Sequence, residues 1–314
     1  MSSAVVLDGG DVERAVSPAD AVEAVRRAFV AHHRGEWTMP PKVYVTNYPA
    51  GDFRAMPALG GGHALLKWVT SFPGNPARGL PTVSGVVLVS NAETGELEAV
   101  LDAAAVTALR TGAAAVLAAE TLGRPAAVTA AVVGAGVNGR AAARTFLARG
   151  RAVALWDVDP ARAEAAASEL GCEVASSLDD ALAADLLVTV TPGHVVLLPE
   201  GSLRPGQHVS LMGADGPGKA EIAPAELARA RVFCDDWEQA SHGGELAHAV
   251  AAGLLGEGEA TRLGAVLAGE APGRTAPDEI TAFDSTGLAI QDLAVAIAAL
   301  ERLPSLGELP RVAL

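Results

Sequence analysis

The stretch Ala131-Val132-Val133-Gly134-Ala135-Gly136-Val137-Asn138-Gly139 decides the fold of this 314-residue chain. Three glycines with the spacing GxGxxG follow an apolar run that predicts a buried strand, and they open a run of helical character, 138–148. In that context the first glycine permits a tight turn and the second lets backbone amides approach a pyrophosphate. The third glycine lets the helix pack closely on the strand. The stretch therefore predicts a Rossmann dinucleotide-binding unit.

An acidic residue follows the second predicted strand of this unit. Asp157 comes directly after the apolar run 152–156, 23 residues beyond Gly134. A carboxylate there can accept hydrogen bonds from both hydroxyls of the adenosine ribose, whereas a 2′-phosphate would meet its negative charge. The expected cofactor is therefore NAD rather than NADP.

Outward from the glycine loop, apolar runs alternate with helical runs. The predicted strands are 127–133, 152–156, 186–190, 208–212 and 232–234, and the clearest helices between them are 138–148 and 160–170. This alternation is typical of a parallel sheet covered by helices. The predicted fold class is α/β, with a doubly wound parallel sheet.

The chain before the glycine loop has a different pattern. An amphipathic helix is predicted over 18–34, with Ser17 as its N-cap, and short apolar runs between 40 and 100 are broken by Gly and Pro and indicate strands. An Ala-rich helix is predicted over 103–122, and a final amphipathic helix over 288–300 returns to the first region. These segments predict a second, smaller α+β domain.

Composition excludes several classes of protein. The formal net charge of −14 disfavours a nucleic-acid partner, because phosphate binding relies on clustered Lys and Arg. Charges interrupt every apolar stretch before it reaches about 18 residues, and the first residues do not read as a secretory signal, so a cytoplasmic protein without a membrane span is expected. Cys172 and Cys234 are too few for a disulfide framework, and the histidines show no metal-ligand spacing. No metal is expected.

Lysine is rare in this chain. Of 23 basic side chains only three are lysines, Lys42, Lys67 and Lys219. An ammonium differs from a guanidinium in having a pKa that can fall far enough for proton transfer, so these positions are candidates for needing it, although chance also produces such counts. Lys67 follows Leu66 and precedes Trp68, so it lies either on a polar face or partly buried with a lowered pKa, and we favour burial.

Charged residues of both signs are candidates for a substrate site. Lys42, Arg54, Lys67 and Arg110 precede the glycine loop and would form a cationic clamp for a carboxylate; an exposed surface strand is the alternative for Lys42 and Arg54. Asp215 follows the predicted strand 208–212, and ligands of parallel sheets bind beyond the carboxyl ends of strands. The alternative for Asp215 is a side chain that only stabilises its turn.

Motifs along most of the chain, from about residue 40 to about residue 292, resemble those of the ornithine cyclodeaminase and μ-crystallin family. They are Lys67-Trp68-Val69, Pro73-Gly74-Asn75-Pro76, Gly79-Leu80-Pro81-Thr82-Val83-Ser84-Gly85, Ala108-Leu109-Arg110-Thr111-Gly112, Gly213-Ala214-Asp215-Gly216-Pro217-Gly218-Lys219 and Phe283-Asp284-Ser285-Thr286-Gly287. The resemblance implies hydride exchange between a nicotinamide and the α-carbon of an amino or imino acid. It also implies a homodimer built through the N-terminal region.

The resemblance assigns roles to particular residues. It implies that Lys67 and Asp215 are catalytic, while Lys42, Arg54 and Arg110 bind the substrate. The cofactor-binding residues expected from the glycine loop and the resemblance together are Thr82, Arg110, Thr111, Gly134, Gly136, Val137, Asn138, Gly139, Asp157, Thr191, Lys219 and Ser285. Ser285 has a second interpretation, as a cap of the final helix, and Lys219 one as a solvated loop residue. Residues 1–112 together with 288–314 are expected to form the substrate-binding and dimerisation domain, and 113–287 the NAD-binding Rossmann domain.

One departure from the family pattern bears on the substrate. In ornithine cyclodeaminases a Glu stands two residues before a Met-Pro pair, whereas this chain has Arg54 before Met56-Pro57. An arginine would repel a distal ammonium and suits a short substrate's carboxylate, and Lys42 with Arg54 resembles the archaeal-type alanine dehydrogenase branch. The predicted reaction is NADH-dependent reductive amination of pyruvate to L-alanine, and its reverse. The alternatives are a ketimine or pyrroline-2-carboxylate reductase, an ornithine cyclodeaminase, and an NAD(P)H-binding protein without turnover. Glu245 and Asp292 receive no role.

Overall fold

The computed structural model of the protein describes residues 3–216 and 218–313. The chain divides into two compact units, which we call unit 1 (residues 1–110 and 288–314) and unit 2 (residues 111–287). The division falls inside one helix, α3 (Ala103–Leu122), whose bounds are those predicted from the sequence. The substrate, dimerisation and cofactor roles expected for the two domains stay predictions.

Unit 2 contains a parallel sheet. Its strands among the described residues are β7 (Ala130–Val133), β8 (Ala154–Trp156), β9 (Glu173–Val174), β10 (Leu186–Thr189), β11 (His208–Leu211), β12 (Arg231–Cys234), β13 (Ala260–Arg262) and β14 (Thr281–Asp284). Their order in the sheet is β13-β12-β14-β11-β10-β7-β8-β9, and the pairs are parallel. The chain runs from β7 to β8 and β9 on one side, and β10 lies on the other side of β7. The predicted doubly wound sheet is thus confirmed, with its switch point between β7 and β10.

Helices connect these strands. They are α4 (Val137–Ala148), α5 (Pro160–Leu170), α6 (Leu178–Leu182), α7 (Pro224–Leu227), α8 (Trp237–Gly243), α9 (Glu245–Ala251) and α10 (Leu263–Leu267), with the short 3₁₀ turn η2 (Glu257–Glu259). The side chain of Asp159 caps α5, Pro160 occupies its first turn, and Gly171 ends it at a φ of 69°. These local signals explain why the sequence predicted α5 correctly.

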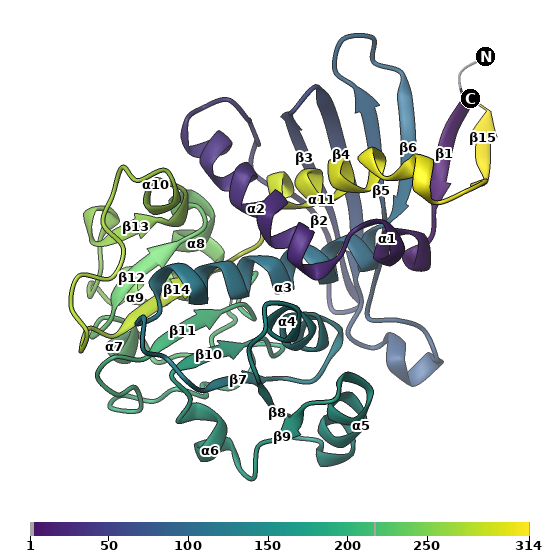
Figure 1. Ribbon diagram of the computed structural model, residues 1–314. Coiled ribbons are helices and arrows are strands. Elements are labelled where there is room, and N and C mark those ends of the chain that lie inside the picture. The colour runs from purple at the N-terminus through teal and green to yellow at the C-terminus, as the bar shows by residue number, and fades with distance from the viewer. Residues whose placement is uncertain (1–2, 217, 314) are drawn as a thin grey trace. The chain divides into compact units, whose positions relative to one another are not determined.

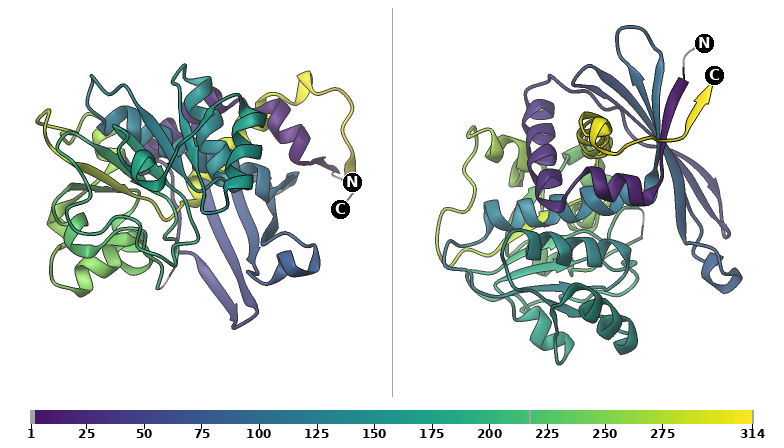
Figure 2. Two further views of the ribbon diagram at one scale, coloured as in Figure 1. Left: turned by 90° about the horizontal axis from the view of Figure 1, so that it is seen from below. Right: turned by 45° about the vertical axis from the view of Figure 1, so that its right-hand side comes forward.

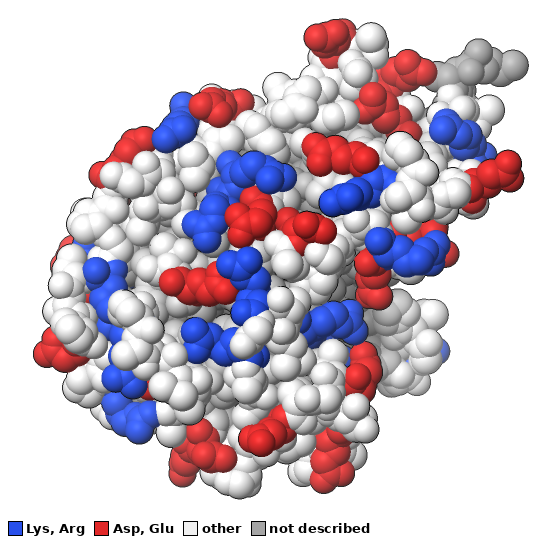
Figure 3. Space-filling view, viewed as in Figure 1, with Lys and Arg blue, Asp and Glu red and all other residues white. Residues whose placement is uncertain are grey.

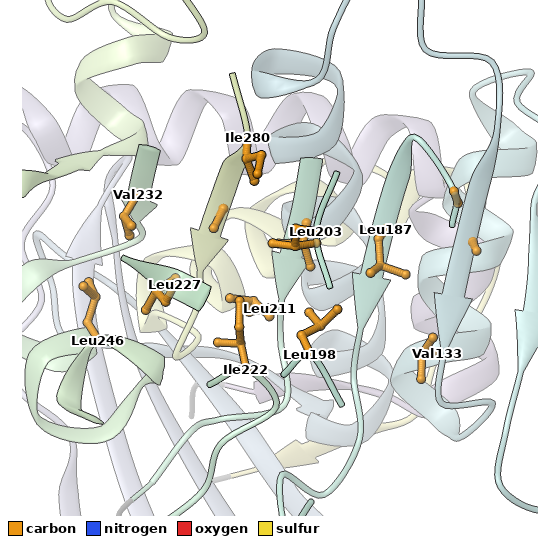
Figure 4. Packing of buried hydrophobic residues seen from close by; sticks show 14 of the residues in the cluster. Val133, Leu187, Leu198, Leu203, Leu211, Ile222, Leu227, Val232, Leu246 and Ile280 are labelled. Carbon is orange, nitrogen blue, oxygen red and sulfur yellow. The ribbon is translucent and has the colours of Figure 1, made fainter. Parts of the chain in front are cut away.

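A continuous apolar core supports the sheet of unit 2. Figure 4 shows Val133, Leu187 and Leu211 on β7, β10 and β11, together with Leu198 and Ile222 from the connecting segments; each is at most 1% exposed. Burying one such side chain contributes about 1.5 to 3 kcal/mol. This core fixes the carboxyl ends of the central strands, where the glycine loop begins.

Unit 1 contains a mixed sheet of order β15-β1-β6-β5-β4-β3-β2. Its described strands are β1 (Ser3–Leu7), β2 (Val43–Asn47), β3 (Gly51–Gly60), β4 (His63–Ser71), β5 (Val83–Asn91), β6 (Leu97–Asp102) and β15 (Arg311–Ala313). β1 pairs parallel to β6, and the other neighbours are antiparallel. Because β1 also pairs with β15, the first and last described strands of the chain lie side by side (Figure 1). The expected smaller α+β domain is confirmed.

Helices α1 (Gly9–Ala15), α2 (Pro18–His33) and α11 (Ala289–Glu301) belong to unit 1, with the 3₁₀ turns η1 (Asn75–Arg78) and η3 (Leu303–Ser305). Ser17 caps α2, as predicted. α11 packs against β3, β4 and α2, so it lies between α2 and the sheet (Figures 1 and 2). Every residue from 289 to 296 is buried, so this part of the final helix has no exposed polar face and the prediction of an amphipathic helix is wrong there. Ile297, Ala298 and Leu300 are partly exposed and Glu301 is exposed.

The longest strand of unit 1 was not predicted. β3 pairs with β4 around Gly61 and Gly62, whose φ angles are 59° and 81°. β1, β14 and β15 were not predicted either. β3 contains Arg54, Pro57 and two glycines, and these residues interrupt the alternation of apolar and polar side chains that would predict a strand.

Among the described residues one helix, α3, is long and apolar enough to cross a membrane, and 72% of its most apolar 18-residue window is buried inside the structure. A core helix of a soluble protein passes the same test. On the face of the molecule drawn in Figure 3, acidic and basic side chains are interspersed.

Candidate active site

Lys67 occupies a core-facing position of β4. Leu65, Lys67 and Val69 are buried, whereas Leu66 and Trp68 between them are each 38% exposed. Side chains of a strand alternate between its two faces, so the lysine lies in the row that packs into unit 1. Lys67 is 1% exposed, which confirms its predicted burial.

Two side chains from two helices hold the ammonium of Lys67. Its Nζ donates to Oδ1 of Asp292 on α11 at 2.9 Å and to Oγ1 of Thr107 on α3 at 2.5 Å. Asp292 is fully buried. The Thr107 hydroxyl donates to the carbonyl of Ala103. Asp292, which received no role from the sequence, is therefore the direct ion-pair partner of the predicted catalytic lysine.

The charges around Lys67 tune its titration. Burial lowers the Lys67 pKa from 10.5 to about 8, because desolvation disfavours the charged form. The negative charge of Asp292 raises it, and the positive charges of Arg110 and Arg54 lower it. Nε of Arg110 lies 3.5 Å from Oδ1 of Asp292, and its Nη1 donates to Gln291 at 3.3 Å. The site thus contains an amine that can gain and lose a proton near neutral pH.

Arg54 lies on the same inner face of the sheet, on β3. Its Nε donates to Oδ1 of Asp52 at 2.7 Å, its guanidinium lies 5.4 Å from the ring centroid of Tyr44, and its side chain is 13% exposed. The alternative of an exposed surface strand is therefore wrong for Arg54. Lys42 is half-buried and immediately precedes β2, which pairs with β3. Unit 1 thus gathers Arg54, Lys67 and Arg110 around one charged cluster.

The glycine loop has the geometry that a pyrophosphate needs. A Cβ on Gly134, whose φ is 108°, would lie 2.7 Å from the carbonyl oxygen of Val190, and one on Gly139 would lie 1.6 Å from that of Gly134. Nothing lies within 4 Å of a Cβ built on Gly136. The first and third glycines are therefore required by packing, and the second leaves open space at the start of α4. Val137 is 68% exposed there and Asn138 partly exposed.

Asp157 lies beside this loop. Its Oδ2 accepts a hydrogen bond from the amide of Ala135 at 2.8 Å, and its Oδ1 accepts one from Asp159 at 2.9 Å. Arg162 lies 3.5 Å from Oδ1. Each carboxylate oxygen has a second lone pair, so Asp157 can accept ribose hydroxyls while it holds the loop. The residues present fit an NAD molecule.

The loops after β10 and β11 converge on a buried carboxylate that the sequence did not predict. Oε1 of Glu221 accepts the amide and the hydroxyl of Thr191, each at 2.7 Å, and Oε2 accepts the hydroxyl of Thr189 at 2.7 Å and the amide of Gly213 at 2.9 Å. Glu221 is fully buried. It therefore ties Thr191, a predicted cofactor residue, to the start of the loop that contains Asp215.

The two predicted residues of that loop lie together. Nζ of Lys219 is 2.5 Å from Oδ1 of Asp215, and both side chains are about one-third exposed or less. The Pro217 of the predicted Gly-Pro-Gly turn lies outside the described residues.

The remaining predicted cofactor residues are distributed over both units. Ser285 donates to Asp235 at 3.1 Å, and the N-cap residue of α11 is Leu288, so the alternative that Ser285 caps the final helix is wrong. Thr111 is 3% exposed. Thr82, in unit 1, is half-buried, and its carbonyl accepts from Phe72 at 2.8 Å. Their roles stay predictions.

Two further buried acids, Glu245 and Asp284, adjoin Glu221. Glu245 accepts from the amide of Glu221 at 2.7 Å, and Asp284 accepts from that of Leu246 at 2.8 Å. Burial raises the pKa of Glu245 to about 9 and that of Asp284 to about 8. Both side chains are therefore held protonated at neutral pH. Within residues 3–216 and 218–313, no group of three or more His, Cys, Asp or Glu side chains could hold a metal ion.

Comparisons with known proteins identify what the chain is similar to. The sequence model described as "Ornithine cyclodeaminase/mu-crystallin family" matches residues 3–306. The alanine dehydrogenase of Archaeoglobus fulgidus is 41% identical over 302 residues, which cover 93% of this chain and 92% of that protein.

Solved structures agree with the sequence comparison. An archaeal alanine dehydrogenase dimer with bound NAD has a TM-score of 0.93 and 39% sequence identity, with all of both chains covered. The Δ1-pyrroline-2-carboxylate reductase of Thermococcus litoralis, in complex with NADH and L-proline, has a TM-score of 0.91 and 26% identity, over 98% of this chain and 100% of that chain.

Proposed function

Because this chain belongs to the ornithine cyclodeaminase/mu-crystallin family, we propose that it interconverts pyruvate and L-alanine as an NAD-dependent oxidoreductase. In the reductive direction pyruvate, ammonium, NADH and a proton give L-alanine, water and NAD. The alanine dehydrogenase relatives, similar over nearly the whole chain, support this choice of reaction.

The observation that carries the proposal is the buried Lys67 on the same sheet face as Arg54. Arg54, Arg110 and Lys42 would bind the carboxylate of pyruvate. The Lys67 ammonium would give a proton to the keto oxygen as ammonia attacks the carbon. The neutral Lys67 amine would then take a proton from the new C–NH3+ nitrogen and pass it to the hydroxyl, which leaves as water. A pKa near 8 suits both the donation of this proton and its recovery.

Asp215 would stabilise the positive charge of the iminium that results, since a carboxylate placed where charge develops lowers the barrier. The residues that would hold NAD are the glycine loop, Asp157, Thr191 and the other predicted cofactor residues. When bound, NADH supplies the hydride that reduces the iminium carbon. Asp157 favours the unphosphorylated ribose of NAD.

A second candidate is the reduction of a cyclic imine such as pyrroline-2-carboxylate. The similarity to the Thermococcus litoralis reductase favours it. This reaction needs no ammonia, because the C=N bond is already present, and it needs a wider pocket than pyruvate does.

A panel of keto acids and cyclic imines, each with and without ammonium, tests the proposal by following NADH absorbance. We expect ammonium-dependent NADH oxidation with pyruvate, and only weak oxidation with larger keto acids. Lys67→Arg is the control, because it keeps the charge and removes the titratable amine. Oxidation that is strongest with a cyclic imine and independent of ammonium would select the second candidate. Release of ammonia from ornithine to give proline would instead make the protein a cyclodeaminase.

We further propose that the protein acts in the cytoplasm as a homodimer. The alanine dehydrogenase of similar structure is a dimer. In unit 1 the sheet face opposite Lys67 carries a row of large apolar side chains between 38% and 56% exposed, which we call the outer face: Val43, Val45, Leu59, Leu66, Trp68 and Val86. Exposed apolar patches of this kind mark protein interfaces. The two free cysteines suit a reducing compartment.

A further inference from the structure

The surroundings of the Lys67 ammonium contain two acceptors in fixed positions. Because the Thr107 hydroxyl gives its proton to the carbonyl of Ala103, it can offer only a lone pair to Lys67. Asp292 offers a carboxylate oxygen from α11. We propose that Asp292, acting with Thr107, is the positioning residue of Lys67: it keeps the amine protonated and aims its third N–H bond at the substrate. This inference rests on the proposed function and deepens it.

The orientation follows from the geometry of an ammonium group, which has three N–H bonds. Two of them are directed to Thr107 and Asp292, so rotation about the Cε–Nζ bond is arrested and the direction of the third bond is fixed. Both acceptors belong to helices, and Asp292 lies in the part of α11 where every residue is buried. A flexible lysine stem alone would not provide such a fixed donor.

The charge state follows from the balance of groups around Nζ. Arg110 on α3 and Arg54 on β3 are the cations that face Lys67, and both oppose its protonation, as does burial. Asp292 on α11 is the acid that opposes them. Without this carboxylate, a buried amine beside two guanidinium groups would lose its proton well below pH 8. It could then no longer donate to a keto oxygen at neutral pH.

The scarcity of lysine makes a direct test practical. Full-length protein labelled with 13C at lysine Cε contains three lysines, and Lys67→Arg identifies the Lys67 signal in an NMR titration. In Asp292→Asn we expect the Lys67 pKa to fall by about 1 unit or more, because a close opposite charge is lost. Thr107→Val should lower it by less, since only a neutral acceptor disappears. An unchanged Lys67 titration in Asp292→Asn overturns the proposal.

Asp11→Asn is the matched control, because Asp11 is also a buried acid of unit 1, at 7% exposure. Its side chain accepts the backbone amide of Asp8, the N-cap residue of α1, instead of contacting Lys67. This variant should lose thermal stability and leave the Lys67 titration unchanged. A shift as large as that of Asp292→Asn would show that any lost buried acid perturbs Lys67, and would overturn the proposal.

Kinetics separate positioning from a purely structural role. In the proposed reaction NADH oxidation requires protonated Lys67, so kcat falls at alkaline pH where Lys67 loses its proton. In Asp292→Asn this fall should begin at a lower pH, by the same shift as the Lys67 pKa measured by NMR. At pH values below this fall, kcat should still be lower by at least about tenfold in Asp292→Asn and in Thr107→Val, because the donor is misdirected. The Kd of NADH should stay near the wild-type value. A lower kcat whose alkaline fall stays at the wild-type pH, combined with an unmoved Lys67 signal, would make Asp292 a packing residue only.

Two features keep the outcomes distinct. If Asp292→Asn does not fold, Thr107→Val still tests the two-acceptor arrangement, and an unchanged kcat and Lys67 titration in that variant contradicts it. The NMR titration also needs no turnover. A shifted Lys67 signal in a protein that reduces no keto acid or imine therefore supports the positioning role and contradicts the proposed function.

Discussion

At the scale of single residues, Arg54 and Lys67 are cations on one sheet face with different chemistry. A guanidinium stays charged and presents a planar fork, whereas an ammonium can titrate. Arg54 is held by Asp52 and lies over the Tyr44 ring, a fixed arrangement suited to an anion. Lys67 has a pKa near 8, which suits proton transfer. In the proposed reaction, anion binding and proton transfer would therefore belong to different side chains.

Arg54→Ala should raise the KM for pyruvate by at least about tenfold, because a charge-assisted hydrogen bond of about 1.5 to 3 kcal/mol is lost. The Kd of NADH should barely change. Arg78→Ala, which removes an exposed arginine of unit 1, is the control and should alter neither constant. Steady-state kinetics with varied pyruvate measure the effect. A wild-type KM in Arg54→Ala would remove this residue from the substrate site.

Asp157→Ser should narrow the preference for NADH over NADPH, because the carboxylate that repels a 2′-phosphate is gone. The serine hydroxyl can still accept one of the backbone hydrogen bonds that Asp157 receives. Asp159→Ser is the control, since serine also caps helices well, and it should leave the preference unchanged. The ratio of kcat/KM for the two cofactors is the readout. A wild-type protein that prefers NADPH tenfold would contradict the argument.

Single residues also show where sequence reasoning ends. Lys67 could be singled out because lysine is rare and its neighbours are apolar. Asp292 could not, because its partner is 225 residues away and its own helix has an almost uniformly apolar sequence. An acid near the start of such a helix gives a signal only once its burial is known, because a buried charge needs a partner. Glu221 was missed for a similar reason, since three of its four donors come from Thr189 and Thr191, at least 30 residues away in the chain.

At the scale of elements, the turn from β7 into α4 allows two glycine substitutions with opposite effects. Gly139→Ala should destabilise the protein by at least about 2 kcal/mol, because its Cβ would overlap the carbonyl of Gly134. Gly136→Ala should change stability by less than about 1 kcal/mol, since its φ of −71° suits alanine and its Cβ meets nothing. It should nevertheless weaken NADH binding about tenfold or more. Denaturant unfolding measures the stability of the two variants, and NADH fluorescence titration measures their Kd for NADH.

Equal losses of stability in the two glycine variants would contradict the packing argument. An unaltered Kd of NADH in Gly136→Ala would mean that the open space beside this residue is not used by a pyrophosphate.

The buried acids of unit 2 predict a pH dependence of stability. Glu245 and Asp284 have folded pKa values of about 9 and about 8, above their ordinary values of 4.5 and 3.8. The folded state therefore binds protons that the unfolded state has released, and stability falls as pH rises through this window. His208, whose pKa is lowered to about 3, has the opposite effect only below its ordinary value of 6.5. Thermal stability should therefore fall between pH 7 and 8.

Thermal unfolding in matched buffers checks this prediction. Glu245→Gln should remove part of the fall, because the amide does not titrate. A melting temperature that rises from pH 7 to 8 would show that these acids are ionised in the folded protein.

Elements with local signals were predictable, and those defined by distant pairing were not. α2 and α5 have capping side chains, and α3 has the bounds expected from its Ala-rich run. β3 was missed because arginine, proline and glycine interrupt its pattern. The Gly61-Gly62 pair was its usable signal, since two glycines with positive φ join hairpin strands.

At the scale of the whole molecule, the outer face of unit 1 predicts the oligomer. Val86→Glu should shift the protein from dimer to monomer, because a charge would be buried in an apolar interface. Val128→Glu is the control, since Val128 is 77% exposed in unit 2 and should leave the dimer intact. Analytical ultracentrifugation at several concentrations distinguishes dimer from monomer in each variant. A Val86→Glu protein that stays dimeric would exclude this part of the outer face from the interface.

Unit 1 is built from two segments with the whole of unit 2 between them in the chain. During synthesis on the ribosome, Lys67 therefore emerges 225 residues before Asp292, and until then it is without its counter-ion. The Rossmann unit is already complete when α11 leaves the exit tunnel. α11 follows the whole of unit 2 in the chain, so a nascent chain acquires the counter-ion of Lys67 only after unit 2 has been synthesised. Polypeptides that stop short of α11 would be expected to bind nucleotide and remain inert.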